Sequence, residues 1–411
     1  MKNTIQTLLT QALSSLKTHG IIAADVSPNI QLSRTKDPSH GDFACNLAMM
    51  LAKPAAKNPR ELAQLLIDAL PQHKDLKKVE IAGPGFINFF IKQSNTLSVI
   101  DTINTQAETY GLSNIGGGRK VQIEFVSANP TGPLHVGHGR GAAYGATVAS
   151  LLSAVGFEVH REYYVNDAGR QMDILGTSVW LRYLQHCGVE LTFPSNAYKG
   201  EYVKDIAEKL FAQHDKNLMH ETAAVFEDIP ADEPDGGDKE IHIDALINRA
   251  KTLLGDDSYR QVFDLGLNLI LDDIKDDLSG FGVTFESWFS ERSLAGKGLI
   301  KKAIERLQNA NYIYEKNGAL WFKSSEFGDE KDRVVVRDNG QSTYFASDIA
   351  YHMDKLDRGF ERVIDIWGAD HHGYIPRVKA ALNALGCDVN KLDVLLVQFA
   401  ILYRDGEKVP M

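Results

Sequence analysis

A chain of 411 residues is long enough for two or three domains, and its 44% hydrophobic and 24% charged residues are typical of a globular protein, which excludes the disordered and collagen-like classes. The formal net charge of −10 argues against a protein that coats nucleic acid without sequence preference, although basic groups gathered on one surface could still bind it. The three cysteines are far apart and lack a Cys-x-x-Cys pair, so they predict neither a disulfide framework nor a zinc ribbon, and we expect them to be small buried apolar residues.

The first helix is amphipathic, with apolar residues at positions 5, 8, 9, 12, 13 and 16 and an end near Gly20. It lacks the continuous apolar core of a signal peptide, and no run elsewhere reaches membrane-spanning length. The sequence therefore predicts a cytoplasmic protein without membrane contact. A later helix begins at Asn58, with Pro59 at its first position and Glu61 at its third, which is a capping-box arrangement.

A strand-like run at 85–91 completes a small α+β domain over residues 1–112. Residues 111–118 are rich in glycine, and we interpret them as the hinge before a second domain, 113–411. Residues 1–110 carry 11 Lys and Arg against 9 Asp and Glu, a balance of +2, which leaves −12 for the rest of the chain. An RNA contact is therefore easier to place on the first domain.

The second domain begins with alternating strands and helices: a strand at 121–126, a helix from 135, a strand at about 157–165 and a helix from about 167. Such alternation predicts a parallel sheet of the doubly wound type. The pattern lapses between about 191 and 285, which we interpret as a mostly helical insertion. Its acidic segment, 227–240, is expected to be a solvated loop. The alternation then resumes, with strands at 319–323 and 333–337, a helix from 347, a strand at 361–367, a helix from 371 and a strand at 394–401.

The first strand of this domain leads through a loop rich in proline and glycine to two histidines, His135 and His138, at the start of a helix. Unpaired backbone N–H groups and the positive end of the helix dipole favour anions there, and imidazoles three residues apart share one face. Gly137 between them lets a flat base approach the backbone. The arrangement indicates an ATP site, although a His-x-x-His pair alone fits a metal-ligand fragment or ordinary histidines equally well.

The loop belongs to the longer string EFVSANPTGPLHVGHGRG at 124–141. Three motifs follow in order, YYVNDAG at 163–169, STYFASD at 342–348 and WGADHHG at 367–373, and the first domain contains GDFACN at 41–46 and GPGFIN at 83–88. Together they resemble the arginyl-tRNA synthetases of bacterial type, a family of class I aminoacyl-tRNA synthetases, over essentially the whole chain. The resemblance implies a doubly wound, Rossmann-like parallel-sheet catalytic domain with a helical insertion, preceded by a small α+β domain that contacts tRNA.

The implied reaction joins L-arginine to tRNA(Arg) in two steps through arginyl-adenylate, with ATP as the energy source and Mg²⁺ supplied with ATP. We expect no resident metal, no nucleophilic Ser or Cys, and a monomer. His135 and His138 would be the catalytic residues, because they would stabilise the phosphates in the transition state.

Two carboxylates and an aromatic ring on one pocket suit a guanidinium, because its planar fork of donors binds carboxylates bidentately and its face stacks on aromatic rings. Glu124 lies at a strand end, and Tyr344 and Asp348 lie four residues apart at a predicted helix start. Each acid alone would be interpreted as a surface or salt-bridged residue. The resemblance implies that Glu124, Asn129, Tyr344 and Asp348 bind arginine.

Gly368 and Asp370 follow an apolar strand, where ligands bind in open parallel sheets, so Asp370 could accept hydrogen bonds from ribose hydroxyls. The resemblance implies the same contact with ATP. His371 and His372 could contact ATP or could equally be cap or core residues. The full ATP-binding set is therefore His135, Gly137, His138, Gly368, Asp370, His371 and His372. Asn166 and Asp167 are candidate contacts for the substrate or the tRNA end.

The family carries a second signature of the Lys-Met-Ser-Lys-Ser type directly after residues that match 406–410, followed by a helical anticodon-binding domain. Neither is present in these 411 residues. We therefore expect this chain to be a C-terminally truncated member that folds but does not aminoacylate alone. Two alternatives stay open. One is a nucleotidyltransferase of the His-x-Gly-His type, and the other is a non-catalytic tRNA-binding paralogue, against which the retention of both histidines argues.

Overall fold

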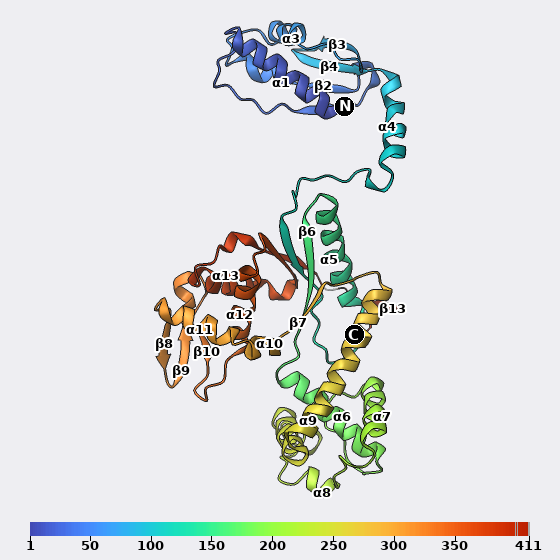
Figure 1. Cartoon of the computed structure of the whole chain (residues 1–411), viewed down its shortest axis with the longest axis vertical. Coiled ribbons are helices and arrows are strands. Elements are labelled where there is room, and N and C mark those ends of the chain that lie inside the picture. The colour runs from blue at the N-terminus through green and yellow to red at the C-terminus, as the bar shows by residue number, and fades with distance from the viewer. Residues whose placement is uncertain (399, 401, 410–411) are drawn as a thin grey trace. The chain divides into compact units, whose positions relative to one another are not determined.

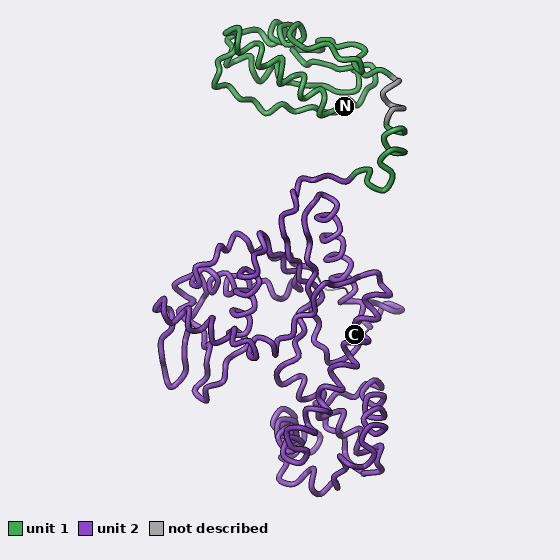
Figure 2. The backbone as a smooth tube through the Cα atoms, viewed as in Figure 1, with its two compact units in different colours: residues 1–111 green, residues 112–411 purple. Residues whose placement is uncertain are grey.

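The computed structural model describes residues 1–398, 400 and 402–409, apart from the side chains of 93–98 and 408. The chain divides into two compact units, residues 1–111 and 112–411, which are coloured separately in Figure 2 and are described here one at a time. None of the described helices is long and apolar enough to cross a membrane.

The first unit packs helices on a four-stranded antiparallel sheet of order β1-β2-β4-β3 (Figure 1). Its elements are α1 (Lys2–Thr18), β1 (Leu32–Arg34), β2 (Phe43–Cys45), α2 (Leu47–Ala52), α3 (Pro59–Asp68), β3 (Leu76–Ala82), β4 (Phe86–Ile91) and α4 (Gln93–Gln106). Helix α1 buries all six apolar positions that its periodicity predicts. Asn58 caps α3, as predicted, by accepting a hydrogen bond from Arg60 N at 2.9 Å. Glu61 pairs with Lys57 at 3.0 Å instead of completing a capping box.

The second unit contains a five-stranded, wholly parallel sheet of order β12-β11-β5-β6-β7. Its strands are β5 (Lys120–Glu124), β6 (Glu158–Val165), β7 (Ser287–Ser290), β11 (Arg362–Gly368) and β12 (Leu392–Val397). This sheet confirms the doubly wound fold. The strand order reverses between β5 and β11, and a crevice at such a reversal is where ligands bind in folds of this type. Of the strand predicted at 394–401, residues 399 and 401 lie outside the described residues.

The helices of the second unit are α5 (Val136–Ala154), α6 (Arg170–His186), α7 (Glu201–His214), α8 (Thr222–Val225), α9 (Lys239–Gly280), α10 (Arg292–Gly296), α11 (Leu299–Asn309), α12 (Tyr344–Asp357) and α13 (Ile375–Ala384). Helix α6 starts three residues later than predicted because Gly169, with φ +90°, precedes it. Helix α12 starts three residues earlier, because Thr343 caps it. A 3₁₀ turn, Ala369–Tyr374, occupies the start of the helix predicted from 371.

The prediction that 319–323 and 333–337 continue the parallel sheet is wrong. They form β9 (Ala319–Phe322) and β10 (Arg333–Val336), which pair antiparallel with each other and with β8 (Ile313–Lys316) in a separate sheet. The turn between β8 and β9 is Asn317-Gly318, with φ values of +54° and +77°. Such a two-residue turn builds a hairpin, whereas parallel neighbours need a longer crossover. A second short hairpin joins β13 (Tyr403–Arg404) to β14 (Glu407–Lys408).

The insertion is mostly helical, as predicted, and contains α7, α8 and α9. The expectation of a solvated acidic loop is wrong for Asp232, which is buried and accepts a hydrogen bond from Ser195 N at 2.7 Å. A carboxylate that receives backbone donors anchors the segment instead of leaving it solvated. Among the cysteines, Cys45 is buried as expected, while Cys187 and Cys387 are only half-buried.

Helices cover both faces of the parallel sheet. On one face α5 packs so closely that a Cβ at Gly145 would lie 2.3 Å from the Phe125 ring. On the other face Lys355 of α12 contacts Glu124 of β5. Consecutive residues of an extended chain point to opposite faces of a sheet. Phe125 therefore faces α5, and Glu124 faces α12.

Candidate active site

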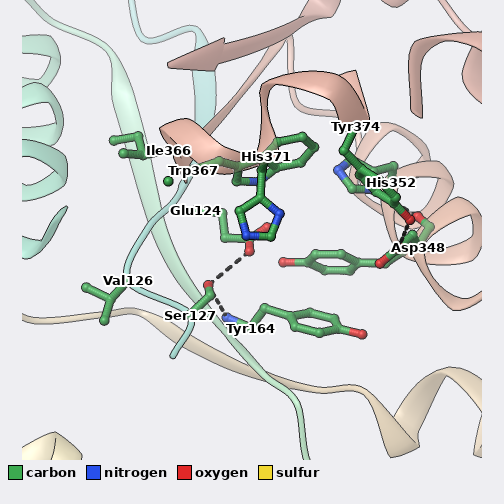
Figure 3. A pocket seen from close by; sticks show the side chains of 12 residues that line it. Glu124, Val126, Ser127, Tyr164, Asp348, His352, Ile366, Trp367, His371 and Tyr374 are labelled. Carbon is green, nitrogen blue, oxygen red and sulfur yellow. Dashed lines mark hydrogen bonds between the residues drawn. The ribbon is translucent and has the colours of Figure 1, made fainter. Parts of the chain in front are cut away.

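A cavity of about 490 Å³ lies at the carboxyl ends of β5 and β11, where the strand order reverses (Figure 3). Its size is that of a pocket for small molecules. Four aromatic side chains and several ionisable groups line it: Glu124, Val126, Ser127, Tyr164, Asp348, Tyr351, His352, Ile366, Trp367, Gly368, His371 and Tyr374.

The chain leaves β5 through a strained turn. Val126 and Ser127 have φ values of +67° and +43°, which non-glycine residues rarely adopt. The turn places Ser127 Oγ where it donates to Glu124 Oε1 at 2.9 Å and accepts from Tyr164 N at 3.1 Å (Figure 3). Glu124 is thus held at the cavity wall. Its other oxygen, Oε2, is ion-paired with Lys355. The simpler interpretation of Glu124 as a salt-bridged acid is therefore correct for one of its two oxygens.

Asp348 lies in the first turns of α12 and faces the same cavity (Figure 3). The Tyr374 hydroxyl donates a hydrogen bond to its carboxylate. Burial raises the pKa of Asp348, and the negative charge of Glu124 adds to that rise, whereas Tyr374 and His352 oppose it. A cation in the cavity would relieve the destabilisation of this charge.

A third buried carboxylate, Glu291, lies beside this pocket and was missed by the sequence analysis. Burial raises its pKa to about 7, with further contributions from the nearby charges of Asp348 and Asp167. With its amide nitrogen facing Glu291, Asn166 donates to Oε2 at 2.6 Å. Glu291 belongs to no recognised motif, and the only signal was its place directly after β7 at the carboxyl edge of the sheet.

The other two residues predicted to bind arginine lie around the loop 166–169, not in the cavity wall. The Asn129 amide lies 3.1 Å from that of Asn166 and donates to Gln171 Oε1 at 2.7 Å. Tyr344 is 55% exposed, and its hydroxyl lies where a Cβ on Gly169 would come within 2.6 Å. The structure thus brings Glu124 and Asp348 together in the cavity and places Asn129 and Tyr344 at its border with this loop.

Asp167, predicted as a substrate or tRNA-end contact, is buried, and its carboxylate already has protein partners. It accepts from Ser290 Oγ at 2.6 Å and from Arg292 N at 3.0 Å. These contacts fix the loop after β6 to the segment after β7. Asp167 therefore holds Asn166 in position beside Glu291.

His135 and His138 cap helix α5 reciprocally. His135 Nδ1 accepts from Gly137 N at 3.1 Å, and His138 Nδ1 accepts from His135 N at 3.2 Å. Because each Nδ1 is an acceptor, each neutral ring carries its proton on Nε2. The rings stack with centroids 3.8 Å apart. Both histidines are therefore organised as Nε2–H donors at a helix N-terminus, a site suited to phosphate.

Burial, with an added contribution from the neighbouring His135, lowers the pKa of His138 to about 4. We therefore expect the ligand-free protein to keep His138 neutral from pH 8 down to about 5, and to gain the proton only as the pH falls through about 4. NMR titration of the imidazole signals would measure this. A midpoint for His138 near its ordinary 6.5 would contradict the proposed hydrogen-bond arrangement.

Of the residues predicted to bind ATP after β11, Gly368 and His371 line the cavity. Asp370 and His372 are exposed and lie outside its lining, with Asp370 Oδ2 3.5 Å from His371 Nε2. Within the described part of the chain, no group of three or more His, Cys, Asp or Glu side chains is arranged to hold a metal ion.

The residues not predicted from the sequence include His352, Lys355 and all four aromatic side chains that line the cavity: Tyr164, Tyr351, Trp367 and Tyr374. The helical period of the sequence could have identified His352 and Lys355. Positions 348, 352 and 355 fall on one face of α12, so the prediction of Asp348 as a site residue implied them as neighbours.

Family models match nearly the whole chain. A model described as "Arginyl tRNA synthetase N terminal domain" matches residues 3–91, and one described as "tRNA synthetases class I (R), catalytic domain" matches residues 100–410. The chain is 65% identical over all 411 residues to the Arginine--tRNA ligase of Thioalkalivibrio sulfidiphilus, and it spans 70% of that protein's length.

Solved structures give the same picture. A Campylobacter jejuni chain described as an arginyl-tRNA synthetase is 35% identical with a TM-score of 0.64, over 78% of this chain and 63% of that one. The Thermus thermophilus arginyl-tRNA synthetase is 22% identical with a TM-score of 0.63, over 97% of this chain and 66% of that one, a likeness that shows the fold.

Proposed function

The chain belongs to the arginyl-tRNA synthetase family, and from this premise we propose that its cavity binds L-arginine beside ATP in order to attach arginine to tRNA(Arg). The observation that carries the proposal is the cluster of buried carboxylates at the reversal of strand order. Glu124 and Asp348 line the cavity, and Glu291 lies close enough to Asp348 for their charges to interact. Lys355 neutralises only part of this cluster, so a further cation would stabilise its ionised form, and the guanidinium of arginine fits it.

In the first step, the arginine carboxylate attacks the α-phosphorus of ATP, the bond to the β-phosphate oxygen breaks, and arginyl-adenylate and pyrophosphate form. In the second, the terminal tRNA adenosine hydroxyl attacks the acyl carbon and AMP leaves. The protein's part is positioning and charge stabilisation. We assign that stabilisation to the Nε2–H groups of His135 and His138, which are neutral and already directed by their caps.

Around this centre we propose that Gly137 gives room for the adenine, that Gly368, Asp370 and His371 bind the nucleoside, and that His372 lies at its border. Asn129, Asn166 and Tyr344 would close the arginine pocket from the loop side. The ligand donors that Mg²⁺ prefers are oxygens, and we propose that the ion enters with the ATP phosphates.

The remaining assignments concern the whole protein. We propose that residues 1–112 contact tRNA, because the positive charge balance of the chain lies there, and that the protein works as a cytoplasmic monomer. The proposed contact predicts that tRNA affinity decreases with added salt.

The test is ATP–pyrophosphate exchange and tRNA charging by the intact protein, with arginine, lysine or no amino acid, in the presence of tRNA. Arginine-dependent charging is the expected result. Exchange driven by a phosphorylated metabolite instead of arginine would indicate a nucleotidyltransferase. Binding of tRNA without exchange would indicate a non-catalytic paralogue.

The pKa of Glu291 predicts how arginine binding depends on pH. Below about 7 its carboxyl group is protonated and neutral, so a bound cation must displace the proton, whereas above about 7 the charge is already present. Arginine should therefore bind more tightly as the pH rises from 6 to 8. Calorimetry would measure this, with Glu291→Gln as the matched variant that loses the dependence. A constant dissociation constant in the unaltered protein would exclude Glu291 from the pocket.

A further inference from the structure

Three buried carboxylates form a row across the parallel sheet. Strand register pairs Glu162 of β6 with Glu124 of β5, and Glu124 with Asp365 of β11, so the three side chains lie side by side on one face. Glu162 and Asp365 are fully buried, and Glu124 is 7% exposed. Like charges on neighbouring strands repel, and buried ions without partners are costly.

Helix α12 carries a matching row of basic residues. His352, Lys355 and Arg358 are spaced three apart and therefore lie on one face of the helix. His352 Nε2 lies 2.8 Å from Asp365 Oδ2, and Arg358 contacts both oxygens of Glu162, at 2.6 and 2.8 Å. Each end of the acidic row thus has its own basic partner.

Lys355 is fully buried and contacts two of the three acids, Glu124 at the centre of the row and Asp365 at one end. Its Nζ lies 2.5 Å from Glu124 Oε2 and 2.7 Å from Asp365 Oδ1. The other oxygen of Glu124 accepts from Ser127 at the cavity wall (Figure 3). Among the three acids in the row, only Glu124 lines the cavity.

We propose that Lys355 is a positioning residue for arginine, because its ammonium holds the Glu124 carboxylate charged and directed at the cavity. The proposal rests on the proposed function. Stability alone explains the buried ion poorly, since apolar residues often replace buried ion pairs without loss. The buried Lys355 ammonium is explained if the Glu124 carboxylate must stay ionised next to Asp365.

Charge interactions support the same role. Burial alone would lower the pKa of Lys355, but Asp365 and Glu124 overcome that effect and raise it, so the amine stays protonated. Burial would likewise raise the pKa of Asp365, yet Lys355 and His352 hold it below its ordinary value. Without Lys355, we expect Glu124 and Asp365 to share a proton. Other titratable groups also face this cluster: Asp348, Tyr351, His352, Glu162, Tyr164, Glu291, His160, Arg358 and Tyr374.

The test replaces Lys355→Met and measures arginine binding by calorimetry together with charging kinetics. We expect the arginine KM to rise about 10- to 100-fold, as for loss of a hydrogen bond to a charged group, with the ATP KM nearly unchanged. At pH 8, where Glu291 is already ionised, binding to the variant should release more protons than binding to the unaltered protein, in which only Asp348 among the cavity acids has a raised pKa. Equal effects on both substrates, with the same proton release in both proteins, would mean that Lys355 is only structural.

Two further variants separate positioning from folding. Arg358→Met removes the partner of Glu162 outside the cavity, so it should lower the thermal unfolding temperature and leave the arginine KM near its starting value. Lys355→Met/Asp365→Asn removes the neighbouring charge as well, so Glu124 should ionise again and arginine affinity should recover relative to the single variant. No recovery in the folded double variant would overturn the proposal. Failure of the intact protein, at the full length of its relatives, to charge arginine would instead overturn the proposed function.

Discussion

Replacement of His135 or His138 by alanine is expected to lower kcat by about 10²–10³-fold while ATP affinity changes little. This is the usual cost of removing one preorganised donor to developing charge, about 2.7–4 kcal/mol of barrier. Both rings are neutral Nε2–H donors fixed by the backbone, so their contribution is greatest when charge shifts toward the departing pyrophosphate. Single-turnover kinetics and nucleotide binding on the intact protein would separate the two effects.

The histidines also cap α5, so a loss of stability must be distinguished from a loss of chemistry. Removal of a helix cap costs about 1 kcal/mol and should appear as a small decrease in the unfolding temperature. Val136→Ala is the matched control, because that exposed residue lies between the two histidines and supplies no donor. A variant with normal kcat but weaker ATP binding would assign the histidines to ground-state binding. Tight, stoichiometric zinc would favour the metal interpretation.

The parts of the fold that the sequence predicted are those with local signals. The alternating apolar strands and the cap at Asn58 act over a few residues and are visible without any knowledge of tertiary contacts. The separate sheet of β8, β9 and β10 was misassigned even though its Asn-Gly turn at 317–318 is a local hairpin signal. The sequence-based assignment did not take this signal into account.

The site residues divide in the same way, into those that a local sequence signal identified and those that it did not. Glu124 and Asp348 belong to contiguous motifs and were found, whereas Glu291 and Lys355 were not, because their roles depend on which strands become neighbours. The register that aligns Glu162, Glu124 and Asp365 joins residues up to 241 positions apart, the separation of Glu124 and Asp365. No spacing rule along one chain encodes such a row. Only the helical face of α12 gave a usable signal.

Replacement of Asp348 by asparagine is expected to raise the arginine KM by about 10²-fold with a smaller effect on ATP, because truncation of one charge in a buried pair typically costs 2–5 kcal/mol. Asparagine keeps the shape of the side chain and can still accept from the Tyr374 hydroxyl, so the lost property is the charge. Asp357→Asn on the same helix, where the acid pairs with Lys302 at 3.0 Å, is the matched control and should leave charging unchanged.

The same carboxylate should govern the choice of amino acid. A site built for a forked donor leaves buried acceptors unpaired when lysine binds, and sites of that kind reject the wrong substrate by about 10⁴-fold. In Asp348→Asn one of those acceptors is neutral, so kcat/KM should fall more for arginine than for lysine. The ratio of kcat/KM for arginine to that for lysine should therefore decrease. Charging with both amino acids by the unaltered protein, Asp348→Asn and Asp357→Asn would measure that ratio. An unchanged ratio in Asp348→Asn would mean that the guanidinium binds elsewhere, and the exposed Tyr344 with the loop at 166–169 would then be the next place to look.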